Sequence, residues 1–204
     1  MRGIFYQRPS KPKYDDMYSL SLPELTEKLV VLLALVTVHC RQTLSLIKRS
    51  NIDKDIERYK IKIPDRSKVT RPRAYQPLLV LPVFQEKPTL CVVGTLERYL
   101  KITDSLRENC DALLITTRRP YKPASKDMIS RWIRAFLVKC GIGKEYAPHS
   151  IRHAATSLAW KKEIDIKIIK NLARWSETSK VFNMFYNRPI ISNKASFAKA
   201  ILNN

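Results

Sequence analysis

The chain has 204 residues, enough for one domain with a sizeable hydrophobic core. A hydrophobic content of 45% excludes a disordered tail, and 38 Lys and Arg residues against 18 Asp and Glu residues give a formal net charge of +20. Because the basic residues are spread along the whole sequence, this charge predicts a polyanionic partner, of which nucleic acid is the usual one. The ordinary alternative is a basic surface that serves only solubility.

The cysteines and the apolar runs limit the kind of site and the compartment. Four cysteines form no CxxC pair and show no zinc spacing, so we expect free thiols in a reducing compartment and no metal ion. The start of the chain lacks the long apolar run of a signal peptide, and the run from Leu29 to Val38 is too short to span a bilayer. We therefore expect an intracellular, soluble protein without a membrane partner.

The first predicted element is a long helix. Residues 1–20 are polar, basic and proline-containing, and we interpret them as an arm or linker. Ser21, Pro23 and Glu24 predict a helix start, with a serine cap, a proline in the first turn and a capping box completed by the glutamate. The helix is expected to reach about Ile47 and, being apolar on almost every side, to lie in the centre of the core.

A small sheet is expected next. Residues 59–63 alternate between polar and apolar side chains, and residues 78–81 form a short apolar run between two prolines. Together they predict a β-hairpin with a long basic tip at residues 65–73. Residues 112–116 predict a third short strand.

The rest of the chain is predicted to be helical. Ser125 can cap one of these helices and Gly141 can end it. The order of one long helix, a small sheet and a run of helices predicts an α+β, mostly helical fold class with a small antiparallel three-stranded sheet. The expected helices cover residues 91–102, 125–140, 149–161, 165–173, 177–186 and 194–202.

Three signals in the last third of the chain point to phosphate chemistry. His149 and Arg152 are three residues apart, so on a helix they share one face and can both reach one phosphate. Trp175 follows a short predicted helix. Tyr186 is expected on the last turn before Pro189, the placement that a tyrosine nucleophile needs. Each signal alone has a plain alternative, because such histidines and aromatic side chains are often part of a core.

Taken in order, these residues resemble the catalytic set of tyrosine recombinases of the phage-integrase type. The stretches HSIRHAATS, ARWSETS and FYNRPI, with QTLSLIKRSNI and KIPDRSKVTRP upstream, are most similar to the recombinases of DIRS-like retrotransposons of animals. The resemblance implies the catalytic-domain fold of DNA breaking-rejoining enzymes over residues 21–191. Residues 1–20 would then be the remnant of an N-terminal region, and residues 192–204 a C-terminal tail or helix.

The resemblance also implies a metal-free and cofactor-free reaction on double-stranded DNA. In this family a tyrosine, here Tyr186, attacks a phosphate, forms a 3′-phosphotyrosyl link and frees a 5′-hydroxyl. Two arginines and a His-type residue stabilise the negative transition state, which assigns His149, Arg152 and Trp175 to the site.

A lysine on the β-hairpin acts in the family as general acid to the leaving oxygen. Lys68, at the predicted tip, is the best match, and Lys60 and Lys62 on the preceding strand are weaker candidates. The contacts to DNA are expected from Lys68, Arg71, Arg73 and Arg174.

The first arginine is where the sequence departs from the family. Relatives place this arginine two positions before QTL, with one residue between them. In this chain QTL is residues 42–44, so the corresponding position is Cys40. Arg41 is the candidate for the role, although neighbouring positions on an ideal helix point about 100° apart.

The resemblance implies a site-specific recombinase or integrase of a mobile element, acting as a homo-oligomer on DNA in the nucleus, without a small-molecule substrate. The alternative is a catalytically decayed DNA-binding module of the same ancestry, which differs from the enzyme at Arg41, Lys68 and Tyr186. A basic RNA-associated protein would explain the charge but not the ordered motifs.

Overall fold

The computed structural model describes residue 14, residues 16–64, residues 78–176, and residues 178 and 180. Helices dominate this part of the chain, and three strands form a small sheet, so the predicted α+β class is confirmed. None of the helices among these residues has the length and apolar character needed to cross a membrane. The elements are α1 (Leu22–Thr37), α2 (Arg41–Ser45), β1 (Ile52–Lys54), β2 (Arg58–Lys62), β3 (Leu78–Pro82), α3 (Val92–Thr103), α4 (Lys126–Lys139), α5 (Ser150–Lys161) and α6 (Ile166–Leu172), with short 3₁₀ turns at Arg49–Asn51, Pro88–Leu90 and Asp104–Leu106.

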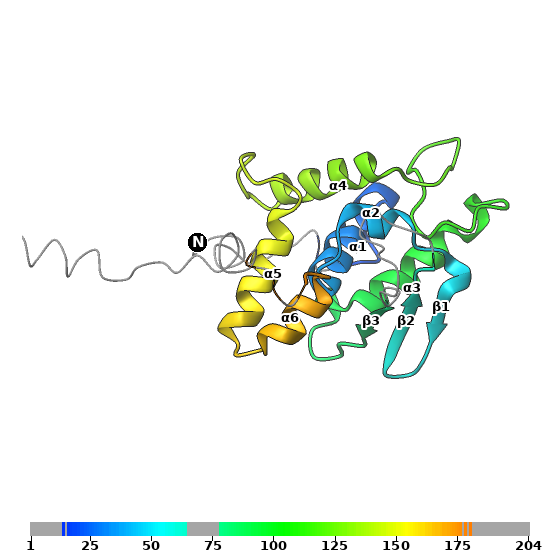
Figure 1. Cartoon of the computed structure of the whole chain (residues 1–204). Coiled ribbons are helices and arrows are strands. Elements are labelled where there is room, and N and C mark those ends of the chain that lie inside the picture. The colour runs from blue at the N-terminus through cyan, green and yellow to red at the C-terminus, as the bar shows by residue number, and fades with distance from the viewer. Residues whose placement is uncertain (1–13, 15, 65–77, 177, 179, 181–204) are drawn as a thin grey trace, which may run out of the picture.

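Helix α1 forms the centre of the molecule (Figure 1) and packs against α3, α4 and α5. It begins with the predicted capping box, in which the Glu24 carboxylate accepts the backbone N–H of Ser21 at 3.1 Å. Every residue from 25 to 34 is buried. The two charged residues in this run are paired: Glu27 accepts from Lys139 Nζ at 2.7 Å, and Lys28 donates to a backbone carbonyl at 2.6 Å.

The prediction of one continuous helix to about residue 47 is wrong. Helix α1 ends at Thr37, Val38 takes a left-handed conformation with φ of 58°, and Cys40 is extended before α2 begins. The apolar pattern did not reveal the break, because buried apolar side chains lie on both sides of it, Leu33 and Ala34 before it and Leu44 and Ile47 after it. The break turns residues 38–40 toward a surface hollow.

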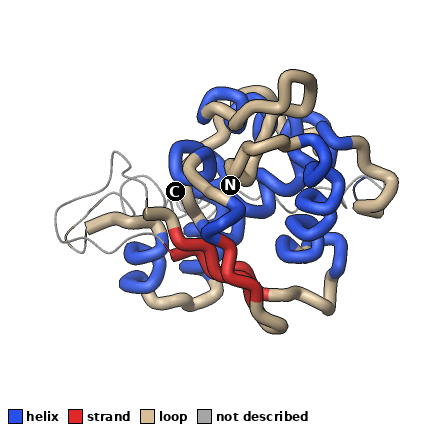
Figure 2. Tube along the Cα trace, turned by 90° about the vertical axis from the view of Figure 1, so that its right-hand side faces the viewer, coloured by secondary structure: helices blue, strands red, loops and turns tan. Residues whose placement is uncertain are grey.

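The sheet consists of three antiparallel strands in the order β1–β2–β3. In Figure 2 the strands lie side by side along one edge of the helical body. Strands β2 and β3 form the predicted hairpin and pair Tyr59 with Leu81 and Ile61 with Leu79, and these four side chains are buried. The predicted hairpin tip lies outside the described residues.

The prediction of a strand at residues 112–116 is wrong, because the third strand is β1. The segment makes only isolated bridges, at Ala112 and at Ile115. Its apolar side chains are buried, and Arg107, which is 1% exposed, donates to the carbonyls of Ala112 and Leu113. The backbone N–H of Leu113 donates to Ile47 and that of Ile115 to the Tyr99 hydroxyl, so partners other than a ladder of strand pairs satisfy this stretch of backbone.

The four predicted helices at 91–102, 125–140, 149–161 and 165–173 are confirmed as α3, α4, α5 and α6. Ser125 caps α4 by accepting the N–H of Met128 at 3.2 Å, and Gly141 follows the helix with φ of 79°. The expected helices at 177–186 and 194–202 lie outside the described residues.

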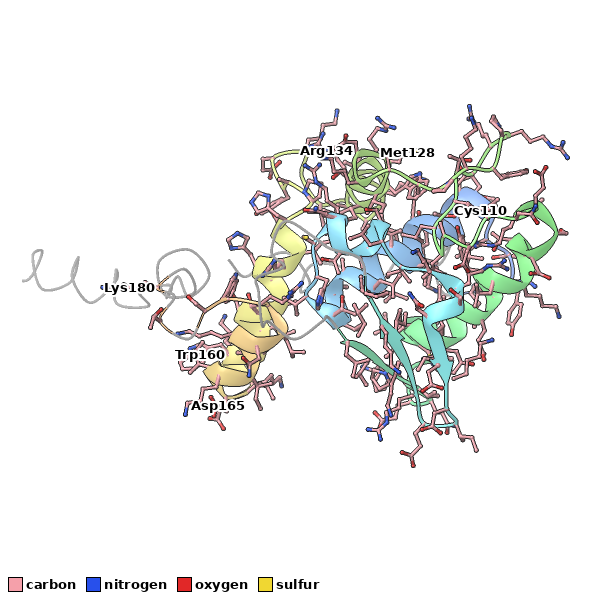
Figure 3. The ribbon with its side chains drawn as sticks, turned by 45° about the vertical axis from the view of Figure 1, so that its right-hand side comes forward. Cys110, Met128, Arg134, Trp160, Asp165 and Lys180 are labelled. Carbon is pink, nitrogen blue, oxygen red and sulfur yellow. The ribbon has the colours of Figure 1, made fainter. Side chains whose placement is uncertain are left out.

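Helices α5 and α6 form a hairpin that positions the candidate site. Asp165 caps α6 by accepting the N–H of Lys167 at 2.7 Å, and α6 packs back against α5. In Figure 3 the start of α5 lies near α4, where Arg134 is labelled, and Trp160 and Asp165 mark the opposite end of the hairpin. Ala173, at the end of α6, contacts Arg152 on α5.

Candidate phosphate-binding site

His149 and Arg152 stand at the start of α5, on the lining of one surface hollow of about 360 Å³. Ile151 between them is buried and fixes this end of α5 against the core. The His149 ring is exposed and lies 5.4 Å from the ring of His153. Helices α1, α4 and α5 and the α1–α2 connection supply the lining, which consists of Ala34, His39, Cys40, Arg41, Ser130, Ile133, Arg134, Pro148, His149, Ile151 and Arg152.

The guanidinium of Arg152 is held in place by the segment that follows α6. Its Nη2 donates to the carbonyl of Ala173, and its central carbon lies 5.1 Å from the ring centroid of Trp175. The Trp175 backbone N–H donates to Lys170 at 2.9 Å, which ties the tryptophan to α6. The structure thus brings together Arg152 and Trp175, 23 residues apart in the sequence.

A second hollow, of about 150 Å³, adjoins the first and shares three lining residues with it: His39, Cys40 and Arg152. Among the described residues, neither lining contains a carboxylate. A concave surface with several cationic side chains and no acid is suited to a phosphate or another anion. The basic side chains on the two linings are Arg41, Arg134, Arg152 and Arg174, with His149 beside them.

Arg41 lines the first hollow but is bound to α4. Its Nη1 donates to Ser130 Oγ at 2.7 Å and pairs with Asp127 at 3.3 Å, and its side chain is 48% exposed. The expectation based on an ideal helix does not apply, because the helix is broken before α2. The direction of Arg41 is set by its partners on α4.

Cys40 occupies the wall between the two hollows. Its sulfur is 3.6 Å from the hydroxyl of Thr43. Burial acts to raise the pKa of the thiol, but hydrogen bonds from Thr43 and Gln42 and the charge of Arg152 act in the opposite direction, and the net pKa lies below its ordinary value. Cys40 thus contributes a small thiol, and no cation, to both linings.

His39 is a site residue that the sequence reasoning missed. Its ring is 8% exposed, Nδ1 lies 2.6 Å from the carbonyl of Thr37, and Nε2 has no hydrogen-bond partner among the described residues. Burial lowers the pKa of His39, the hydrogen bond to Thr37 opposes this, and the charges of Arg152 and Arg174 lower it further. A lone histidine after an apolar helix gives no sequence signal for such a place.

Ser130 and Arg134 were also missed. They are four residues apart on α4, so they share one face of that helix and line the first hollow. That spacing was the available signal.

The remaining predicted residues divide into two groups. Arg174 is described: it has a φ of 53°, lines the second hollow, and its Nη1 is buried without a hydrogen-bond partner among the described residues. Lys60, half-buried, and Lys62, exposed, lie on β2. The other four lie outside the described residues and stay predictions, namely Lys68, Arg71, Arg73 and Tyr186.

Within the described part of the chain, no group of three His, Cys, Asp or Glu side chains is placed to hold a metal ion. The cysteines there are all free thiols. The guanidinium and imidazole groups on the two linings can bind and polarise an anion.

No family model and no curated protein matches this sequence. Solved structures do match. A post-cleavage complex of the XerH site-specific recombinase with palindromic difH substrate has a TM-score of 0.66 at 14% identity, over 94% of this chain and 50% of that chain. XerA recombinase gives a TM-score of 0.59 at 20% identity, over 97% of this chain and 64% of that chain.

A lambda integrase dimer bound to a COC′ core site gives a TM-score of 0.51 at 18% identity, over 86% of this chain and 56% of that chain. This chain thus spans about half the length of the XerH chain and under two thirds of the other two. These structures are at most 20% identical to this chain, so the likeness is one of fold: the helices and the small antiparallel sheet form the catalytic-domain fold of tyrosine recombinases.

Proposed function

We propose that the chain is the strand-cleaving and rejoining domain of a site-specific tyrosine recombinase or integrase. The observation that carries the proposal is the assembly of His149, Arg152 and Trp175 within this fold at two adjoining hollows, whose described lining residues include no carboxylate. The recombinases with this fold that were solved on DNA support double-stranded DNA as the partner. A net charge of +20 supports the same partner.

The proposed reaction is a transesterification without metal or cofactor. The oxygen of Tyr186 forms a bond to the phosphorus while the bond to the 5′-oxygen breaks. The phenolic proton passes to solvent water, the leaving 5′-oxygen gains a proton from Lys68, and nothing is oxidised or hydrolysed. Because the phosphotyrosyl ester replaces a phosphate ester, the reverse attack by a 5′-hydroxyl rejoins the strand.

The described residues would act on the charge that develops during this step. Arg152, oriented by Ala173 and Trp175, would bind a nonbridging oxygen, and His149 would donate to the same phosphate. Because the backbone carbonyl and the indole ring already fix the guanidinium, little reorganisation is needed when the anion arrives. We further propose that the enzyme works as a homo-oligomer on DNA, for a mobile element of the DIRS-like group, in the nucleus.

One observation favours the alternative, a decayed DNA-binding module. The position assigned to the first arginine holds Cys40, and the neighbouring Arg41 is paired with Asp127 and Ser130 on α4. A module that binds DNA but no longer cleaves it would show these features.

Incubation with a nicked suicide duplex, followed by a denaturing gel, separates the two functions. A cleaving enzyme gives a covalent protein–DNA adduct that is absent from Tyr186→Phe and present in the matched variant Tyr121→Phe. An adduct that persists in Tyr186→Phe would contradict the assigned nucleophile. Binding by mobility shift without any adduct would identify the decayed module.

A further inference from the structure

His39 presents a buried hydrogen-bonding atom for which the described structure shows no partner. The residue lines both hollows, together with Cys40 and Arg152. Its Nε2 is buried and unpaired among the described residues. Leaving such an atom unsatisfied costs about 1–3 kcal/mol, so it requires an explanation.

The contact at Nδ1 determines what Nε2 can do. A backbone carbonyl only accepts, so at 2.6 Å from the Thr37 oxygen Nδ1 must carry a proton. In the neutral ring Nε2 is then an acceptor, and only the protonated ring makes it a donor. A phosphodiester has acceptors only, so Nε2 can bind it in the protonated state alone.

The surroundings oppose that state as long as no anion is bound. Burial of the ring is the largest effect against the imidazolium, and the charges of Arg152 on α5 and of Arg174 after α6 act in the same direction. The other ionisable groups on the two linings are Arg41 from α2, Arg134 from α4, His149 before α5 and the Cys40 thiol beside His39; no carboxylate is among the described lining residues. The unliganded site therefore favours the neutral ring.

A bound phosphate reverses this balance, because its negative charge offsets the arginines and its oxygen accepts from Nε2. We propose that His39 is a further phosphate-binding residue of this site, and that it takes up a proton when DNA binds. This inference rests on the proposed function and adds to it. The positive charge that Cys40 does not provide in the register of the first arginine is supplied by its neighbour, and only when the anion is present.

The proton uptake can be followed directly, because the chain contains only three histidines. Their imidazole Cε1–H signals are recorded by NMR between pH 5 and 8 and assigned with single Gln variants. The probe is sulfate, which does not titrate in this range, against sodium chloride at equal ionic strength. We expect saturating sulfate, and a duplex bound to Tyr186→Phe, to raise the pKa of His39 by about one unit or more.

DNA affinity gives a second readout. With Tyr186→Phe as the background, the dissociation constant should weaken as the pH rises, by up to about tenfold per pH unit where His39 takes up its proton. His39→Gln should reduce this slope, because of the two histidines on the linings only His149 then remains, and should match its parent at high pH. His153→Gln, which changes a histidine outside both linings, should keep the slope.

The outcomes separate the inference from the proposed function. An unmoved His39 signal with both sulfate and DNA, or an unchanged pH slope in His39→Gln, overturns the inference even when the suicide duplex gives an adduct. A His39 signal that moves on DNA binding supports the inference even when no adduct forms, and in that case it is the cleavage function that fails.

Discussion

At the scale of single residues, the candidate site depends on Val38. A β-branched residue with φ of 58° is rare, and such conformations persist where the surrounding structure holds them. Here the turn ends α1 and places His39 and Cys40 on the hollow walls. The consequences for Cys40 and His39 can each be measured.

Replacing Cys40 with arginine tests the missing cation. Cys40→Arg removes the contact of the thiol with the Thr43 hydroxyl, which at 3.6 Å is a weak one. It adds a charge-stabilising donor beside Arg152, and we expect at least about tenfold more Tyr186–DNA adduct on the suicide duplex. Arg41→Ala should cost little in the Cys40→Arg background.

The parent protein provides the contrast. If Cys40→Arg has no effect and Arg41→Ala alone abolishes the adduct, Arg41 is the working arginine. It would then have to exchange its contacts with Ser130 and Asp127 for the phosphate.

His39 also predicts how stability depends on pH. Burial and the two nearby arginines hold its pKa below the unfolded value of about 6.5. Between these two values the unfolded chain binds a proton that the folded chain does not. The free energy of unfolding therefore falls as the pH drops through this window, by up to about 1.4 kcal/mol per pH unit from this group.

Urea unfolding of the parent and of His39→Gln between pH 5 and 8 measures this contribution. At pH 8 the His39 ring is neutral in both the folded and the unfolded chain. The difference between the two free energies of unfolding at this pH therefore gives the part of the cost of the substitution that does not depend on pH. A variant with the same slope as the parent below pH 6.5 would show that His39 is not responsible.

At the scale of elements, the α5–α6 hairpin orients Arg152. If the ring face of Trp175 is what orients the guanidinium, Trp175→Phe should keep most of the adduct yield. Trp175→Ala should lose it by about 2- to 30-fold, as expected for a cation–π contact of about 0.5–2 kcal/mol. If Trp175→Phe and Trp175→Ala lose the same amount of adduct in a single turnover, the indole N–H, which both variants lack, is the functional group.

Two carbonyls of the segment at residues 112–116 depend on one buried side chain. Arg107, which follows the 3₁₀ turn after α3, donates to Thr103 and to the carbonyls of Ala112 and Leu113. Arg107→Met leaves these two carbonyls without that donor, and we expect a loss of at least about 2 kcal/mol in the free energy of unfolding.

Urea denaturation monitored by circular dichroism measures this loss. Arg131→Met, on the exposed side of α4, is the matched control and should change stability by less than about 0.5 kcal/mol. An equally small change in the stability of Arg107→Met would mean that the carbonyls of Ala112 and Leu113 find other donors, such as Thr103 or water, when the guanidinium is absent.

At the scale of the whole molecule, the charge of +20 predicts binding controlled by salt. If six to ten phosphates are contacted, affinity for duplex DNA should fall by about 10³–10⁵ between 50 and 200 mM salt. Fluorescence anisotropy with two unrelated duplexes should give nearly the same slope. Affinity that stays flat over this range would count against DNA as the partner.

The metal-free reaction is tested on the same preparation. A chelator added before the suicide duplex should leave the adduct yield unchanged. Loss of the adduct in chelator, restored by a divalent cation, would contradict the mechanism.

The sequence by itself determined the features that local contacts control. The cap at Ser21, the cap at Ser125 and the hairpin of β2 and β3 each depend on residues close together in the chain. His149 and Arg152 are three residues apart, so they share one face at the start of α5, and both line the same hollow. The resemblance of the ordered motifs agreed with the fold found in the structure.

Only the tertiary structure decided the features that depend on distant partners. Arg41 is directed by Asp127 and Ser130, 86 and 89 residues away. The apolar residues 112–116 predicted a strand, but their backbone is paired with separate groups, among them the Arg107 guanidinium, the Ile47 carbonyl and the Tyr99 hydroxyl, and not with a neighbouring strand. The apolar pattern of the sequence indicates which residues are buried, and buried residues continue on both sides of the break at Val38, so the pattern did not show it. The direction of the backbone there is set by the helices packed around it, which are distant in the sequence.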